Sequence, residues 1–253
     1  MNVVGIVPAR YASVRFPAKA LASIAGRTMI ARVVGRALAA RKLDLVVVAT
    51  DHDEIARAAE EAGAKAILTD PSLPSGTDRV AEVARGIDCG WVINIQGDEP
   101  LLPSENIDLV AGHMSAHPEL PMATLRTRIV RDEDRSNPNV VKVVTDVAGR
   151  ALYFGRSPLP YFRNPGAAWK HIGLYGYRRD FLLKFASMPP TSLERTEGLE
   201  QLRALENGFP IAVLETSLDS PAVDAPEDVA KVEELIRVAE GAEPGSARVS
   251  RKP

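Results

Sequence analysis

Three cations follow an apolar run at the start of the chain. Val3–Val7 is followed by a loop that contains Arg10, Arg15 and Lys19, and no Asp or Glu occurs before Asp44. A local field this positive favours a polyphosphate. The loop has neither the G-x-x-x-x-G-K-[ST] pattern nor the G-x-G-x-x-G pattern. The sequence therefore predicts an anion site of another kind at the end of a buried strand.

Two carboxylates that are far apart in the sequence could serve one metal ion. Asp98 follows the apolar run Trp91–Ile95, and Gly97 beside it lets a ligand or metal approach the backbone closely. Carboxylate oxygens suit Mg²⁺, which takes one or two of them together with phosphate oxygens and water. Asp224 stands two residues before Pro226, a residue type favoured in the first helical turn. Asp224 is therefore either a helix cap or, if that helix returns to the sheet, the second carboxylate.

A polar turn, Ser75–Arg79, leads into a predicted helix. Its amides, hydroxyls and guanidinium could hold a base, a ribose or a phosphate. Ser-Gly-Thr is also a common way to begin a helix, so both interpretations stay open.

Two later segments carry polar groups on one face. Period two places His171 and Tyr175 together on a predicted strand, which fits either a polar floor for a sugar or an ordinary half-buried strand. Glu197, Glu200 and Gln201 share one face of a predicted helix at spacings i, i+3 and i+4. A solvated face is the default interpretation of that spacing.

The elements that must position these residues alternate in the first half of the chain. Short apolar strands separated by amphipathic helices predict βαβ units and a parallel sheet. Ser104 is the predicted N-cap of the helix that follows Pro103. Strands without long helices between them are predicted around residues 139–177, with an irregular excursion at Ser157–Trp169 that we expect to make a dimer contact. The second half is then predicted to contain one helix over Ser192–Asn207, a strand over Ile211–Glu215 and a helix over Pro226–Ala239.

Composition limits the classes of protein to consider. The 253 residues carry a net charge of −2 and one cysteine, Cys89. This balance gives no case for nucleic-acid binding, and one cysteine excludes an intrachain disulfide and a cysteine zinc cluster. No stretch approaches the ~20 apolar residues of a membrane span. We expect a cytoplasmic protein with no membrane insertion, one domain over residues 1–240 with halves at 1–120 and 121–240, and a disordered tail over 241–253.

Several motifs in order resemble one family, the 3-deoxy-manno-octulosonate (Kdo) cytidylyltransferases. The matching stretches extend from residue 8 to residue 229, and they are PARYASVRFPAK, ATDH, SGTDR, NIQGDEP, NPNVVKVV, ALYFGR, HIGLYGYR, LERTEGLEQLR and VDAPEDV. The resemblance implies an α/β, Rossmann-like nucleotidyltransferase fold. Such a fold has a mostly parallel central sheet flanked by helices, with a smaller β-rich excursion for dimerisation and sugar binding. It also implies a Mg²⁺-dependent homodimer that converts CTP and Kdo to CMP-Kdo and pyrophosphate for lipopolysaccharide biosynthesis.

The resemblance also implies roles for individual residues. The phosphates of CTP would be held by Arg10, Arg15 and Lys19. The catalytic residues would be Arg15, Lys19 and Asp98. The rest of the nucleotide would be surrounded by Ala9, Ser75, Gly76 and Arg79. Mg²⁺ would be held by Asp98 and Asp224. The sugar would be bound by Gln96, Arg156, His171, Tyr175, Glu197, Glu200 and Gln201.

The chain departs from the family pattern in two places. Ala225 stands where the family usually has Thr, and the Pro160–Lys170 region is shorter than in many members. The second departure leaves the exact sugar and the dimer contact open. The alternatives are the same chemistry on 8-amino-Kdo or another 2-keto sugar acid, and a non-catalytic nucleotide-binding relative. The sequence identifies no clear general base, and Asp98 is one hypothesis.

Overall fold

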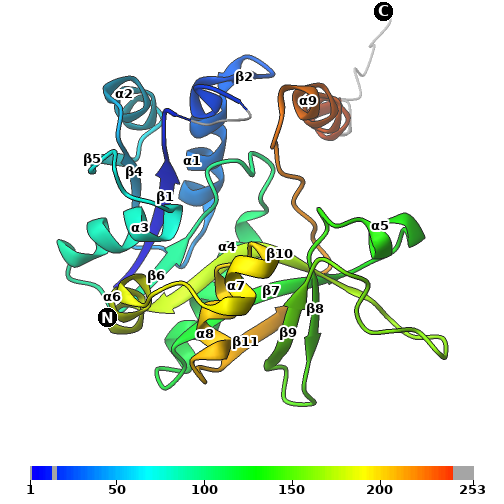
Figure 1. The fold of residues 1–253 in the computed structure, drawn as a ribbon. Helices are drawn as coiled ribbons and strands as arrows, with labels where there is room; N and C mark the ends of the chain where they lie inside the picture. Colours follow the sequence, from blue (N-terminus) through cyan, green and yellow to red (C-terminus); the bar gives the residue numbers. More distant parts are fainter. Residues whose placement is uncertain (1, 13–15, 242–253) are drawn as a thin grey trace, which may run out of the picture.

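Strands rich in Val, Ile and Leu form one mixed sheet in the computed structural model, which describes residues 2–12 and 16–241 (Figure 1). Seven strands lie along its main path. In spatial order they are β11 (Ile211–Glu215), β7 (Met122–Arg128), β10 (Trp169–Arg178), β6 (Trp91–Asn94), β1 (Val3–Ala9), β4 (Leu45–Thr50) and β5 (Lys65–Leu68). Only β10 runs antiparallel to its neighbours on this path. The mostly parallel sheet predicted from the sequence is confirmed.

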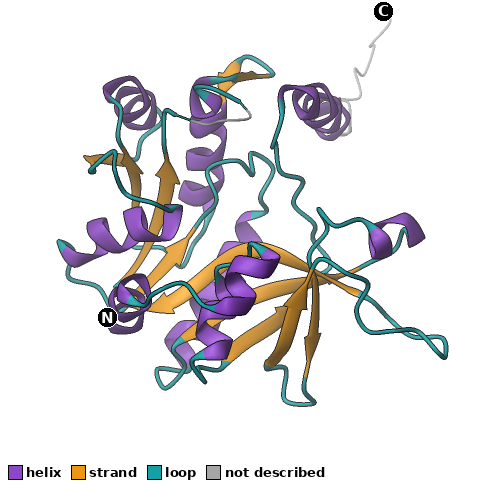
Figure 2. Cartoon of the chain, viewed as in Figure 1, coloured by secondary structure: helices purple, strands orange, loops and turns teal. Residues whose placement is uncertain are grey.

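Helices cover both faces of this sheet (Figure 2). Strand β1 shows why, since Val3 and Val7 pack on one side while Val4 and Ile6 pack on the other. The first face is covered by α1 (Met29–Ala39), α2 (Asp53–Glu61) and α4 (Ser104–Ala116). The second face is covered by α3 (Gly76–Arg85), α6 (Arg179–Ser187), α7 (Ser192–Glu197) and α8 (Gln201–Glu206).

A hairpin departs from the main sheet beside β10. Its strands are β8 (Lys142–Thr145) and β9 (Ala151–Gly155), and Lys142 pairs with Lys170 of β10. A short helix, α5 (Asp132–Ser136), precedes the hairpin, and an irregular segment leads from β9 to β10. The β-rich excursion expected in the second half is therefore present.

The last helix returns to the beginning of the chain. Helix α9 (Pro226–Gly241) packs against the small ribbon β2 (Ser23–Ile24) and β3 (Arg27–Thr28), which follows the single turn η1 (Lys19–Leu21) (Figure 1). Ile24 and Met29 bury Val232 and Ile236 of the helix. The Val223 amide donates to the Asp98 carbonyl at 2.9 Å, which fixes the segment before α9 to the loop after β6.

Some sequence predictions require correction. Ser104 is the first residue of α4 rather than its cap, and Pro103 occupies the cap position. The single helix predicted over Ser192–Asn207 is two helices, because Gly198 adopts a left-handed conformation with φ of 63°. Strand β7 and helix α6 were not predicted. Within the described residues no helix is both long and apolar enough to cross a membrane, and the predicted tail falls almost entirely outside those residues.

Candidate active site

Two connected cavities lie where the parallel strands end. The first has a volume of about 400 Å³ and is lined by the loops that follow β1 and β6, the start of α3, and Asp224. The second has a volume of about 430 Å³ and is lined by β10, the 139–141 loop and the start of α8. Gly76, Gln96 and Glu200 line both. The two cavities therefore adjoin one another at these three residues.

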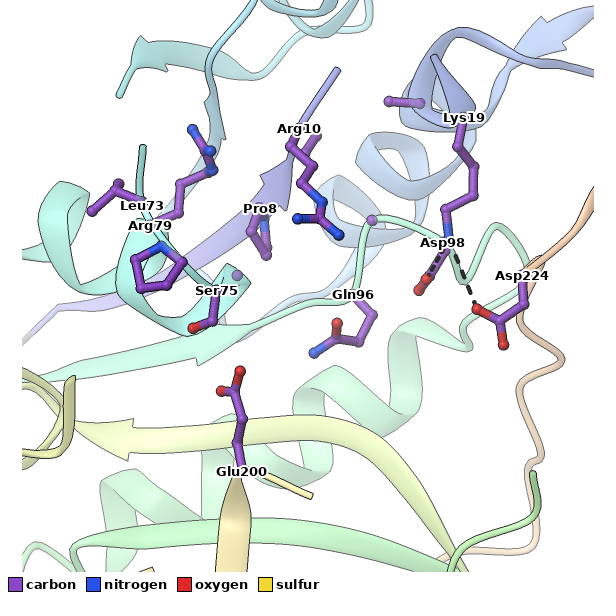
Figure 3. A pocket seen from close by; sticks show the side chains of 15 residues that line it. Pro8, Arg10, Lys19, Leu73, Ser75, Arg79, Gln96, Asp98, Glu200 and Asp224 are labelled. Carbon is purple, nitrogen blue, oxygen red and sulfur yellow. Dashed lines mark hydrogen bonds and ion pairs between the residues drawn. The ribbon is translucent and has the colours of Figure 1, made fainter. Parts of the chain in front are cut away.

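A lysine and two carboxylates meet at one end of the first cavity (Figure 3). The Lys19 ammonium donates to Asp98 Oδ2 at 2.7 Å and to the Val223 carbonyl at 3.0 Å, and Asp224 Oδ1 lies 3.9 Å away. The two carboxylates thus converge on one cationic centre. No group of three or more acidic, histidine or cysteine side chains within residues 2–12 and 16–241 forms a complete metal site. Asp98 and Asp224 nevertheless fit Mg²⁺, which commonly takes two carboxylates and completes its shell with substrate oxygens and water.

Gly97 brings the loop after β6 against the end of β1. A Cβ at this position would lie 2.6 Å from the Pro8 carbonyl oxygen, closer than real Cβ contacts. The backbone on either side of it carries Gln96 and Asp98 into the cavity. The absence of a side chain at Gly97 therefore sets the distance between the carboxylate and the basic loop.

Of the cations predicted to hold an anion, Arg10 and Lys19 line the first cavity, and Arg15 falls outside the described residues. Arg79 also lines the cavity, but its guanidinium extends away from Gln96 and Asp98 (Figure 3). It donates to Asp51 at 3.1 Å and to Thr69.

Arg79 braces the cavity through Asp51. The carboxylate of Asp51 also accepts the Tyr11 amide at 2.8 Å, and both members of the Arg79–Asp51 ion pair are almost fully buried. The pair therefore ties the loops after β1 and β4 to helix α3.

Ser75 caps helix α3, because its hydroxyl accepts the Asp78 amide at 3.2 Å and donates to the Asp78 carboxylate at 2.8 Å. The first turn of α3 thus presents backbone amides and the positive end of the helix dipole at the cavity. Ala9, Ser75 and Gly76, which the resemblance places around the nucleotide, all line this cavity.

Five of the predicted sugar residues line the second cavity, namely Gln96, His171, Tyr175, Glu200 and Gln201. Arg156 and Glu197 do not. The Glu197 carboxylate accepts the Arg156 amide at 2.9 Å and the Tyr153 hydroxyl at 3.2 Å. The Arg156 guanidinium donates to the Glu197 and Pro138 carbonyls at 2.7 and 2.9 Å. These two residues join neighbouring segments outside the cavity lining.

Two buried polar atoms beside the second cavity, Asn94 Oδ1 and Gln201 Nε2, have no hydrogen-bond partner among the described residues. The Glu99 and Ser220 side chains, which line the same cavity, interact with each other. A buried polar group without a partner costs about 1–3 kcal/mol, so the two unpartnered atoms indicate a site that a polar ligand or water completes. Sequence reasoning missed Asn94, Glu99 and Ser220. Two signals for these residues were available in the sequence. Glu99 stands beside Asp98, and Asn94 ends an apolar strand.

Burial keeps two titratable side chains of the second cavity, His171 and Tyr175, uncharged at neutral pH. Burial lowers the pKa of His171 to about 3, and the nearby Lys170 acts in the same direction. Burial raises the pKa of Glu99 to about 7, with a smaller contribution from Asp98, and burial also raises the pKa of Tyr175. Neutral donors and acceptors of this kind suit hydroxyl groups, whereas the first cavity suits phosphates.

Comparisons with known proteins identify the family of this chain. The cytidylyltransferase family model matches residues 4–217. The 3-deoxy-manno-octulosonate cytidylyltransferases of Geobacter sulfurreducens and Pelobacter propionicus are 49% and 48% identical to this chain over 94% of it, and the matches cover 100% and 98% of those proteins.

Solved structures give the same result. A structure of CMP:2-keto-3-deoxy-manno-octonic acid synthetase complexed with CTP superposes with a TM-score of 0.90 at 39% identity, covering 94% of this chain and 100% of that one. A 4-diphosphocytidyl-2C-methyl-D-erythritol synthase from Anaerococcus prevotii shares only the fold, with a TM-score of 0.64 at 12% identity over 93% of this chain and 96% of its own. The chain belongs to the 3-deoxy-manno-octulosonate cytidylyltransferase family.

Proposed function

We propose that this nucleotidyltransferase joins CTP and Kdo to give CMP-Kdo and pyrophosphate. The observation that carries the proposal is the contact between the two cavities through Gly76, Gln96 and Glu200. One cavity offers cations and helix amides for a triphosphate, and the other offers neutral polar groups for a sugar. Their junction is the point at which the reacting atoms would meet.

The nucleotide occupies the first cavity in this proposal. Arg10, Arg15 and Lys19 hold the phosphates, while Ala9, Ser75 and Gly76 surround the rest of the nucleotide. Arg79 acts as the brace of this cavity, since its guanidinium is committed to Asp51 and Thr69.

The sugar occupies the second cavity. It is bound by side chains that line that cavity, namely Gln96, His171, Tyr175, Glu200 and Gln201. Asn94 and Gln201 supply the unpartnered atoms described above, and Glu99 and Ser220 line the same cavity. Arg156 and Glu197 support the cavity from outside its lining.

Charge determines what the site must do during the reaction. The anomeric hydroxyl of Kdo attacks the α-phosphorus in line, a new oxygen–phosphorus bond forms, and the bond to pyrophosphate breaks. Negative charge grows on the phosphoryl oxygens and the leaving group, and Lys19 and Arg10 are the fixed cations beside them. Asp98 is the proposed acceptor of the hydroxyl proton. Binding the two substrates in adjoining cavities orients the attacking hydroxyl toward the α-phosphorus, and this orientation supplies the remaining rate acceleration.

Magnesium is the proposed metal, held by Asp98 and Asp224. When bound, it would neutralise charge on the phosphate oxygens. Asp98→Asn is expected to lower kcat by about 100-fold or more at saturating Mg²⁺, since it removes both the metal ligand and the proton acceptor. Near-normal turnover of this variant would exclude both roles.

We also propose that the protein is a homodimer. It would act in the cytoplasm, in lipopolysaccharide biosynthesis. Leu152 and Tyr161, which are 62% and 91% exposed, lie in and after the β8–β9 hairpin, outside both cavities. Exposed apolar side chains of this size favour a protein contact. Sedimentation of the purified protein at the mass of two chains is the expected result.

Pyrophosphate release is the direct test of the reaction. The assay contains CTP and Mg²⁺ with Kdo, 8-amino-Kdo, N-acetylneuraminate or no sugar. Release that requires both CTP and Kdo is expected. Release with one of the other sugars but not with Kdo would identify that sugar as the substrate instead. CTP binding without pyrophosphate release for any sugar would support a non-catalytic relative.

A further inference from the structure

A threonine on β7, Thr124, contacts His171 of the second cavity without lining that cavity itself. Thr124 is fully buried, and its Oγ1 lies 2.9 Å from His171 Nε2. The same oxygen lies 2.8 Å from the Leu174 carbonyl and 3.1 Å from the Ile172 carbonyl. The register between β7 and β10 shifts between Ile172 and Tyr175, which is where these carbonyls meet the hydroxyl.

These contacts determine where the proton of the imidazole ring lies. A threonine hydroxyl has one proton to donate, and both carbonyls can only accept. If the hydroxyl gave its proton to His171, its oxygen lone pairs would face two carbonyl oxygens. If Nε2 carries the ring proton instead, the hydroxyl accepts from the ring and donates to the Leu174 or Ile172 carbonyl, so one oxygen–oxygen contact without a proton remains instead of two.

The other ring nitrogen then has no proton. No group within residues 2–12 and 16–241 hydrogen-bonds Nδ1 of His171, while the residue lines the second cavity. The titratable and charged groups near the ring are Lys170 and Tyr175, and the edge of Phe154 packs at 5.0 Å. Burial and the nearby Lys170 both disfavour the charged form of the ring.

We propose that Thr124 is a positioning residue that fixes His171 as the Nε2–H tautomer, so that Nδ1 accepts a hydrogen bond from a hydroxyl of the bound sugar. The identity of the ligand rests on the proposed function, but the tautomer does not. Thr124 thus contributes to sugar recognition without touching the sugar. Its role depends on its single proton rather than on its shape.

The tautomer can be observed directly in the full-length protein. Histidine labelled with ¹⁵N is incorporated, and the His171 signals are assigned by their loss in His171→Gln. At neutral pH we expect Nε2 to carry the proton and Nδ1 to resonate as an unprotonated nitrogen. A protonated Nδ1 would overturn the proposal, and this readout needs neither substrate nor turnover.

Kinetics test the consequence for the sugar. Thr124→Val removes the hydroxyl and is expected to raise the KM for Kdo about tenfold while the KM for CTP stays unchanged, as for loss of one oriented hydrogen bond. Thr124→Ser keeps the hydroxyl and should restore the wild-type KM. The matched control is Thr127→Val, a buried threonine of the same strand on its other face, which should leave both KM values unchanged.

Three results would contradict this positioning role. They are equal effects of the two valine variants, failure of Thr124→Ser to restore the KM, and a parallel rise in the KM for CTP. Absence of turnover by the wild type with Kdo would instead overturn the proposed function, and the ¹⁵N spectrum would still decide the tautomer.

Discussion

At the scale of single residues, His171 has a protonation state that the stability of the protein should report. Its pKa of about 3 in the folded protein lies below the ordinary value of 6.5, because burial penalises the charged ring. Below pH 6.5 the unfolded chain therefore binds a proton that the folded protein does not. The free energy of unfolding should fall by about 1.4 kcal/mol for each pH unit from this residue, until the pH approaches 3.

Urea unfolding at pH 7.5 and pH 5 measures this loss. His171→Gln has no titrating ring and should lose about 2 kcal/mol less than the wild type between the two values. If His171→Gln follows the wild-type curve, His171 is charged in the folded protein.

Single residues also show the limit of sequence reasoning. The pattern around Asp224 predicted either a cap or a metal ligand, and only the fold shows where its side chain lies. The Asp228 carboxylate accepts the Asp224 and Ala225 amides at 2.9 Å each, and Asp224 lines the cavity, as the metal-ligand alternative requires. Arg156 and Glu197 show the reverse case. Their types suit a sugar site, but the hydrogen bonds that commit them to each other arise from the packing of distant segments.

At the scale of elements, the spacing between β1 and the loop after β6 depends on Gly97. Gly97→Ala would force a Cβ to within 2.6 Å of the Pro8 carbonyl, so the loop must move and displace Gln96 and Asp98. We expect kcat to fall at least about tenfold, since displacements of about 1 Å are costly at a reacting centre.

The same substitution at Gly35 is the control for Gly97→Ala. Gly35 lies on α1 with nothing within 4 Å of its added Cβ. Gly35→Ala should preserve kcat and raise the free energy of unfolding by about 0.5–1 kcal/mol. Wild-type activity in Gly97→Ala would show that the loop has room that the structure does not.

Lys142 joins the loop before β8 to the residue that follows β9. Its ammonium donates to the carbonyls of Asn137, Val140 and Arg156 at 2.9, 2.6 and 2.5 Å. Lys142→Met keeps the chain length but leaves those carbonyls without this donor. The free energy of unfolding should fall by about 2–4 kcal/mol, and the KM for Kdo should rise more than that for CTP.

Urea unfolding and the pyrophosphate assay together test the role of Lys142. Lys65→Met, on the exposed side of β5, is the control and should change neither quantity. A large loss of stability with unchanged KM values would mean that Lys142 holds the hairpin but not the cavity.

Elements with strong periodicity were predictable, while those defined by their neighbours were not. Strand β11 was predicted with the bounds that the structure shows. Strand β7 was missed although it lies between β10 and β11, because its sequence, MATLRTR, mixes apolar, threonine and arginine residues. The sequence does not show whether the two arginines of this strand are exposed to solvent or paired with acidic side chains. The break at Gly198 was missed because a glycine is tolerated within a helix as well as at its end.

At the scale of the whole molecule, the last helix closes the site by returning to the first residues of the fold (Figure 1). Asp224 lies 3.9 Å from Lys19 at the start of the segment that leads into α9, and α9 packs on Ile24 and Met29. The sequence shows both ends of this contact but nothing that joins them, so their meeting could only be stated as a condition. We expect the proposed metal site to depend on this apolar packing outside the cavities.

Ile236→Asp tests this dependence. Ile236 is 3% exposed against the ribbon, so a charge there should release α9 and weaken the hold on Asp224. We expect the Mg²⁺ concentration for half-maximal activity to rise at least about tenfold, as for loss of one carboxylate ligand, with the rest of the fold retained by circular dichroism. Leu235→Asp places the same charge on the neighbouring residue, which is 42% exposed, and should behave as wild type. Equal Mg²⁺ dependence in both variants would mean that the packing of α9 does not position Asp224. The segment before the helix would then hold Asp224 by itself, through the Val223–Asp98 hydrogen bond and the hydrogen bond from the Asp224 amide to Asp228.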